Sequence, residues 1–257
     1  MKINQVAAQL WTLRDHLKTP VDVAASLKKV RAMGYEAVQD SGMGPIEEAE
    51  LVKILKGEGL VLCATHEASN DILDNTAKVI EHLQKLGCKH TAYPYPAGID
   101  FSKQDDVDGL VRKLDAAGEK MSQAGQVLSY HNHAHEFYRF QGKPLLEYIY
   151  AKTNPRFLLA ELDTYWVQAG GGDPVAWCKK MAGRMPLLHL KDYGVGPDGK
   201  PHFAEIGNGN LDWPAIISTA EASGTEWFIV EQDVCPGDPF ESLAQSFRYI
   251  KANLASK

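Results

Sequence analysis

The chain has 257 residues, of which 44% are hydrophobic and 23% are charged, a composition ordinary for a globular domain with a sizeable core. The net charge of −6 argues against a nucleic-acid partner, since a nucleic-acid surface needs a basic face. The first residues lack the apolar run of a signal peptide, and no segment has the length and apolarity of a membrane span. We therefore expect one domain spanning residues 1–257 and no membrane partner.

The positions of the cysteines indicate the cellular compartment in which the protein is expected. The four cysteines lie far apart and form no Cys-x-x-Cys pair. Cys63, Cys88 and Cys178 lie in apolar or helical stretches, as buried, reduced thiols do, whereas Cys235 does not. Reduced thiols of this kind are typical of the cytoplasm, so we expect a cytoplasmic protein.

Short apolar stretches alternate with amphipathic ones along the chain. After a strand-like start at residues 1–5, the predicted strands are residues 6–11, 37–40, 60–65, 90–93, 127–130, 157–162, 187–190 and 227–230. The predicted helices are residues 21–33, 46–58, 72–86, 107–124, 144–152, a helix opened by Pro174, 214–222 and 240–254. Residues 192–211 form the longest connection, which we expect to be irregular and functional.

This order of elements predicts the fold class. Eight strands, each followed by a helix, imply a parallel sheet, and eight strands can close into a barrel. About 250 residues is also the typical length of such a barrel. The competing doubly wound open sheet usually has a glycine-rich turn after its first strand, but residues 12–15 here are Thr-Leu-Arg-Asp. We therefore predict the α/β class and a (β/α)8 TIM barrel.

Polar side chains, all but one of them able to bind a metal ion, follow most of the later predicted strands. They are His66, Glu67, His131, His133, His135, Glu136, Asp163, His189, Lys191 (as a cation), Glu231 and Asp233. In a barrel, these strand ends form the mouth where substrates bind. Imidazoles and carboxylates from separate strands are the ligands that a divalent ion needs. Because side chains alternate along a strand, His131 and His133 share one face, as do His189 and Lys191.

Each of these residues also has an ordinary structural explanation. A single histidine at a strand end is more often solvated or hydrogen-bonded than a ligand, and Asp163 could cap the following turn. Glu231 closes the apolar residues 228–230, and a carboxylate there needs a partner when buried. Glu161 shares a face with Asp163 one layer deeper, so we predict a supporting hydrogen-bonding role for it. The joint occurrence of such groups on four consecutive strands favours metal binding.

Six short segments carry a resemblance to a known family. They are QLWTLR at 9–14, YHNH at 130–133, LDTYW at 162–166, HLKD at 189–192, GNGNLD at 207–212 and VEQD at 230–233. In this order they make nearly the whole chain similar to the xylose-isomerase-like TIM barrels called sugar phosphate isomerases/epimerases. That superfamily also contains ketose 3-epimerases, inosose dehydratase and endonuclease IV.

The resemblance implies one divalent metal ion (manganese, cobalt, magnesium or zinc) held by strands five to eight. Carried over residue by residue, the ligands are His131, Asp163, His189 and Glu231. The epimerases commonly have glutamate at the first position and use two metal-bound glutamates as bases on opposite faces of the substrate. His131 resembles instead the fifth strand of inosose dehydratase and of enzymes that eliminate from 3-keto-glycosides. The resemblance leaves open whether His131 or His133 is the fifth-strand ligand.

The resemblance also implies an enzyme with a carbohydrate substrate. We expect a metal-dependent isomerase or epimerase of a sugar or sugar phosphate that acts through an enediolate next to a keto group. The alternative is a metal-dependent lyase or dehydratase of a 3-keto sugar or inosose. A third class of function is a DNA-repair nuclease or a non-catalytic sugar-binding barrel, and the nuclease is disfavoured by the acidic net charge. We expect a homodimer or a higher homo-oligomer as one possible assembly.

Seven side chains are the candidates for these roles. The catalytic candidates are Glu231 as base, His133 as second acid/base, and Lys191 as a cation for a developing oxyanion. A solvated loop lysine is the alternative for Lys191. The candidate substrate-binding residues are His66, Trp11, Trp166 and Glu136.

Overall fold

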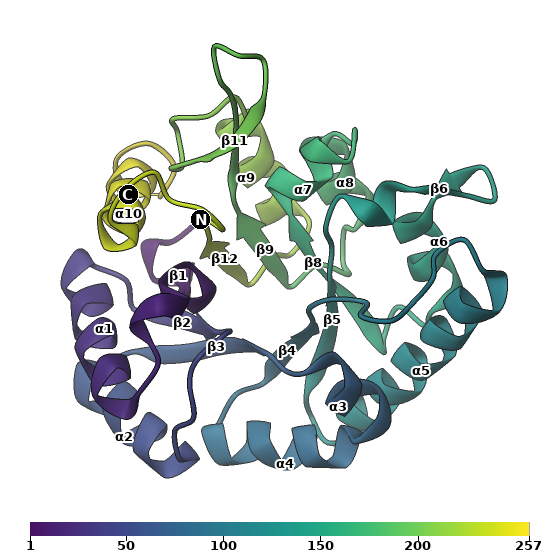
Figure 1. The fold of residues 1–257 in the computed structure, drawn as a ribbon, viewed down its shortest axis with the longest axis horizontal. Helices are drawn as coiled ribbons and strands as arrows, with labels where there is room; N and C mark the ends of the chain where they lie inside the picture. The colour runs from purple at the N-terminus through teal and green to yellow at the C-terminus, as the bar shows by residue number, and fades with distance from the viewer. Residues whose placement is uncertain (257) are drawn as a thin grey trace.

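The computed structural model describes residues 1–256 and contains a closed barrel of eight parallel strands with helices around it (Figure 1). In order around the barrel, the strands are β1 (Val6–Gln9), β12 (Trp227–Val230), β9 (Leu187–Leu190), β8 (Leu158–Asp163), β5 (Val127–His131), β4 (His90–Tyr93), β3 (Val61–His66) and β2 (Ala37–Asp40). β1 pairs in parallel with both β12 and β2 and so closes the barrel. The predicted (β/α)8 barrel is confirmed, and an open sheet is excluded.

The helices that surround the barrel begin and end at local sequence signals. They are α1 (Pro20–Met33), α2 (Glu48–Glu58), α3 (Ser69–Asp74), α4 (Thr76–Leu86), α5 (Gln104–Gln123), α6 (Leu145–Lys152), α7 (Thr164–Ala169), α8 (Pro174–Lys180), α9 (Trp213–Ala222) and α10 (Pro239–Asn253). Thr19 and Asp22 form a capping box at the start of α1, and Gly34 ends it with φ 113°. Within residues 1–256, no helix is long and apolar enough to cross a membrane.

Four local predictions are wrong or incomplete. The strand predicted at 6–11 ends at Gln9, and Leu10–His16 is a 3-10 helix. Residues 1–5 contain a 3-10 helix, Ile3–Gln5, and not a strand. The helix predicted at 72–86 is two helices, α3 and α4, because Asn75 has φ −128° and ψ 37° and interrupts the helical backbone. The short helix α7 follows β8 directly and is absent from the prediction, because six residues are too few to show a helical period.

The connection at 192–211 is more ordered than predicted. It contains an antiparallel hairpin of β10 (Asp192–Val195) and β11 (Pro201–Ala204). A second small hairpin pairs β6 (Arg139–Phe140) with β7 (Lys143–Pro144). Both hairpins lie outside the barrel sheet, whose strand pairs are all parallel (Figure 1).

The barrel interior is layered, and the layering positions the site. One buried layer is small and apolar and consists of Ala7, Ala37, Cys63, Ala64, Leu187 and Ile229. Two positions further along β1, β2, β9 and β12 come polar side chains, namely Gln9, Gln39, His189 and Glu231, all buried. Because side chains on the same face of a strand recur every two residues, these groups form the next layer toward the C-terminal mouth.

The carboxylate of Asp192 holds the long connection against the barrel. Asp192 is fully buried, and its Oδ2 accepts hydrogen bonds from the backbone N–H groups of Gly207 (2.8 Å) and Gly209 (3.1 Å). The same oxygen accepts from Trp213 Nε1 at 2.7 Å. Because three donors from the loop and from α9 share this one buried acceptor, the loop depends on it for its shape.

We expect Gly209→Ala to lower the free energy of unfolding by about 1–3 kcal/mol, as overpacking does. An added Cβ would lie 2.3 Å from Asp192 Oδ1, with no room for the buried carboxylate to move. Denaturant titration measures the effect. Gly57→Ala on α2 is the matched control, since its Cβ would meet nothing within 4 Å. Equal stability of the two variants would contradict the role of Asp192.

A pH effect on stability is expected from His90 on β4. His90 is buried, and burial lowers its pKa although Glu226 lies 3.3 Å from its Nε2. Below about pH 6.5 the unfolded chain therefore binds a proton that the folded chain does not, so this group costs stability as the pH falls. His90→Gln should reduce the slope of unfolding free energy against pH in this range. The exposed His202→Gln is the control, and an unchanged slope in His90→Gln would refute the assignment.

Candidate active site

Four predicted ligands from neighbouring strands converge at the C-terminal mouth, and we call them the ligand cluster. They are His131 at the end of β5, Asp163 at the end of β8, His189 in β9 and Glu231 just after β12. All four are buried, and one ligand atom of each lies within 4.8 Å of the others. Two imidazole nitrogens and two carboxylate oxygens at this spacing suit a divalent metal ion, so the residues fit the metal that the family resemblance implies.

Lys191 lies among the carboxylates of this site. Its Nζ is 3.0 Å from Asp163 Oδ2, 2.9 Å from Glu231 Oε2 and 2.8 Å from Asp233 Oδ2. Burial alone would lower the pKa of Lys191, but the three carboxylates raise it above its usual value. Its exposed fraction of 1% excludes a solvated loop lysine. Lys191 is therefore a fixed positive charge, and its catalytic role stays a prediction.

The charges of the cluster follow from burial and from neighbours. Burial alone would lower the pKa of His189, but Glu161 and Glu231 raise it to about 10. Burial, and then the charge on His189, lower the pKa of His131 to about 3. Burial raises the pKa of Asp163 to about 6 although Lys191 opposes the shift. Near neutral pH, the protein alone thus has a charged His189 and a neutral His131.

A buried polar group lies directly beneath the ligand cluster. Glu161 Oε1 is 2.5 Å from His66 Nε2 and 3.1 Å from His189 Nε2. Glu161 Oε2 accepts a hydrogen bond from Gln39 Nε2 at 2.6 Å, and Gln39 Oε1 accepts from Gln9 Nε2 at 2.7 Å. The two glutamines are absent from the sequence prediction. The available signal is that each is a polar residue at or next to the end of a short strand.

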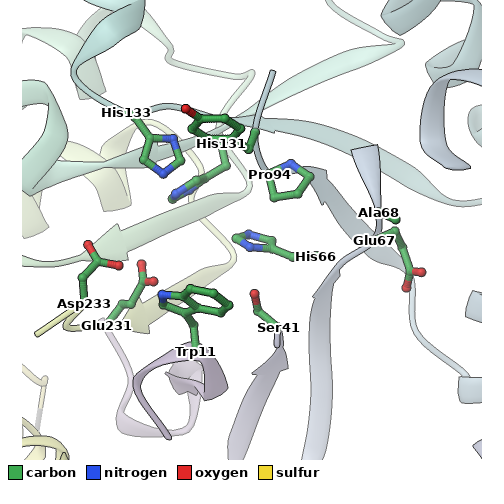
Figure 2. A pocket seen from close by; sticks show the side chains of 11 residues that line it. Trp11, Ser41, His66, Glu67, Ala68, Pro94, His131, His133, Glu231 and Asp233 are labelled. Atoms are coloured by element: carbon green, nitrogen blue, oxygen red, sulfur yellow. The ribbon is translucent and has the colours of Figure 1, made fainter. Parts of the chain in front are cut away.

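A cavity of about 420 Å³ opens beside the cluster (Figure 2). Its lining consists of Trp11, Ser41, His66, Glu67, Ala68, Pro94, Tyr95, His131, His133, Glu231 and Asp233. Figure 2 shows Glu231 and Asp233 on one side and His131 and His133 on another. The size suits a small polar molecule, and the cavity brings together the predicted residues Trp11, His66, His133 and Glu231.

Two predicted substrate-binding residues lie outside this lining. Glu136 is fully buried, where its carboxylate accepts hydrogen bonds from Tyr130 OH (2.9 Å) and the backbone N–H of His133 (2.7 Å). Substrate binding by Glu136 is therefore withdrawn in favour of a structural role. Trp166 lies next to the cavity, with its ring 5.5 Å from that of His133, and its contact with substrate stays a prediction.

A closed (β/α)8 barrel with acids, bases and a cation gathered at its C-terminal mouth has the layout of a barrel enzyme. The chain belongs to the xylose isomerase-like TIM barrel family, which it matches over residues 27–253. This match confirms the resemblance seen in the sequence.

Two characterised relatives are similar to this chain at modest identity. The rhizopine catabolism protein MocC of Rhizobium meliloti is 24% identical over 88% of this chain and 80% of its own length. The inosose dehydratase of Lactiplantibacillus plantarum is 24% identical over 57% of this chain and 54% of its own length.

Solved structures share the fold over nearly the whole chain. A sugar phosphate isomerase/epimerase from Parabacteroides distasonis has a TM-score of 0.82 and 23% identity, covering 97% of this chain and 94% of that chain. An L-ribulose 3-epimerase has a TM-score of 0.74 and 16% identity, covering 97% and 94%. At these identities the similarity establishes the fold and leaves the reaction to be argued from the site.

Proposed function

We propose that the protein is a divalent-metal-dependent isomerase or epimerase acting next to the keto group of a sugar or sugar phosphate. The observation that carries the proposal is the buried ligand cluster, which opens onto a cavity lined by the acid/base side chains Glu231 and His133. A metal ion held by the cluster would act as a Lewis acid on the substrate carbonyl and a neighbouring hydroxyl.

Glu231 and His133 are the proposed proton-transfer groups. Burial alone would raise the pKa of Glu231, but Lys191 and His189 hold it well below its usual value, so Glu231 is ionised at neutral pH and has a free acceptor oxygen. His133 lies across the cavity from Glu231 (Figure 2). Epimerisation requires two such groups on different sides of a substrate carbon, because the proton is removed from one face of that carbon and a proton is returned to the other. His66 and Trp11 line the same cavity and are the proposed substrate contacts.

A dehydratase is the second candidate, and one observation favours it. Burial, and then His131, lower the pKa of His133 to about 2, so His133 is poorly suited to return a proton. In a dehydration, Glu231 would take the proton next to the keto group and pass it to the β-hydroxyl, which leaves as water, so one acid/base group on one face is enough. The similarity to an inosose dehydratase supports the same alternative, with a cyclic polyhydroxylated ketone as substrate.

Product analysis in deuterated water decides between the two reactions. The Mn²⁺-loaded protein is incubated with a panel of keto sugars, keto sugar phosphates and inososes. We expect an epimer or isomer with deuterium next to the keto group, and loss of that product in His133→Ala. His131→Glu restores the family's more common ligand and should retain turnover. A dehydrated, ultraviolet-absorbing product would establish the dehydratase, and neither product from the whole panel would contradict both reactions.

A further inference from the structure

The carboxylate of Glu161 is shared by three histidines beneath the ligand cluster. Besides His66 and His189, it approaches His131, whose Nδ1 lies 3.3 Å from Glu161 Oε1. The other oxygen accepts from Gln39 Nε2, and Glu161 has no exposed surface. These partners come from β2, β3, β5 and β9, so one side chain on β8 links much of the barrel interior. Removing it would leave Gln39 Nε2 and His66 Nε2 without their hydrogen-bond partner.

This carboxylate bears on which nitrogens can bind a metal ion. An imidazole nitrogen that carries a proton cannot give its lone pair to a metal. His131 Nδ1 has no hydrogen-bond partner among the described residues, but the negative charge of Glu161 at 3.3 Å favours a proton on it. His189 Nε2 lies 3.1 Å from Glu161 Oε1 and 2.7 Å from Gln39 Oε1, so two acceptors favour a proton there. The lone pair of His131 then belongs to Nε2. His189 is charged in the protein alone, so its Nδ1 can give a lone pair only when a bound metal ion displaces the proton there. His189 Nδ1 lies 2.8 Å from Glu231 Oε2 and 3.9 Å from Asp163 Oδ2, within the ligand cluster.

A second metal site formed by His66, His131, Glu161 and His189 is the competing interpretation, since their ligand atoms also lie within 4.8 Å of one another. However, Glu161 Oε1 itself lies where the three imidazole nitrogens converge. The hydrogen bond from Gln39 holds the carboxylate there, and Gln39 Oε1 is also 2.7 Å from His189 Nε2. A metal ion at this point would have to displace the carboxylate, so the geometry favours support over coordination.

We propose that Glu161 is a positioning residue that sets the proton positions of His131 and His189 and so presents one nitrogen of each to a divalent metal ion. The inference rests on the proposed function, since it assumes that the ligand cluster binds the metal. Carboxylates behind metal-bound histidines fix the ring orientation, and losing one typically costs about 10–100-fold in metal affinity. The chain from Gln9 through Gln39 orients the carboxylate in turn.

Two variants and two measurements test this role. Glu161→Gln keeps the shape and an amide oxygen but loses the charge, and Glu161→Met removes both acceptors. Nitrogen-15 NMR of metal-free protein reports which nitrogen of His131 is protonated, and Mn²⁺ titration reports affinity. We expect Nδ1 protonation in wild type, a move to Nε2 in Glu161→Met, and about 10–100-fold weaker Mn²⁺ binding in both variants. Thermal unfolding shows whether each variant is folded. If Glu161→Met does not fold, the Mn²⁺ affinity of Glu161→Gln decides whether Glu161 has this role.

Glu136→Gln is the matched control, because Glu136 is also a fully buried glutamate but binds Tyr130 and a backbone N–H. It should retain the wild-type tautomer and Mn²⁺ affinity. Unchanged tautomer and affinity in the Glu161 variants would overturn the inference, as would Mn²⁺ located on Glu161 itself in a metal-soaked crystal. A wild type that takes up no Mn²⁺ would contradict the proposed function, whereas the metal-free tautomer shift still decides the role of Glu161.

Discussion

Glu231→Gln is expected to lower the rate of proton removal next to the substrate keto group by about 10²–10⁴-fold, the usual contribution of a general base. The glutamine has the same shape but cannot accept that proton at neutral pH. It also loses the charged contacts that Glu231 Oε2 makes with Lys191 Nζ (2.9 Å) and His189 Nδ1 (2.8 Å). Deuterium incorporation from solvent into the best substrate of the panel measures the step.

The control for this variant is Glu241→Gln on the surface of α10, because Glu241 lies outside the ligand cluster and the cavity lining. Among the described ion pairs, its carboxylate pairs only with Arg248. Metal content is measured in parallel, so that loss of the ion and loss of the base are separated. Deuterium incorporation at the wild-type rate in Glu231→Gln, with metal bound, would remove Glu231 from the mechanism.

Asp163→Asn is expected to lower bound metal and activity by at least about tenfold, because it removes a charged ligand from the cluster. The substitution removes the metal-binding charge of Asp163 and keeps its helix-capping role. Asp163 Oδ1 accepts a hydrogen bond from the backbone N–H of Trp166 at 2.9 Å and so caps α7, and asparagine caps a helix equally well. The fold should therefore survive while the negative charge near Lys191 Nζ is lost.

Asp173→Asn is the matched control, since Asp173 caps α8 through Val175 N–H at 2.9 Å but lies outside the ligand cluster. Elemental analysis after dialysis against Mn²⁺ gives the metal content of both variants, and circular dichroism gives the fold. Stoichiometric metal and full activity in Asp163→Asn would refute the central claim about the cluster.

The sequence by itself determined the barrel and the candidate ligands, because both depend on local patterns. The strands at 37–40, 90–93, 187–190 and 227–230 are predicted with the bounds that the structure has, since each is a short stretch between turn and helix signals. In a parallel barrel all C-terminal strand ends meet at one mouth. Polar residues at strand ends far apart in sequence could therefore be assigned to one place without any knowledge of distances.

Only the tertiary structure decided what each side chain contacts, because the partners come from strands up to 150 residues apart, as in the contact of His189 with Gln39. Glu136 and Glu231 are both glutamates near strand ends. Glu136, however, is fully buried and accepts hydrogen bonds from Tyr130 OH and a backbone N–H, so it does not line the cavity. Lys191 meets three carboxylates that no local pattern relates to it. Such contacts depend on how the barrel closes, and closure is a property of all eight strands together.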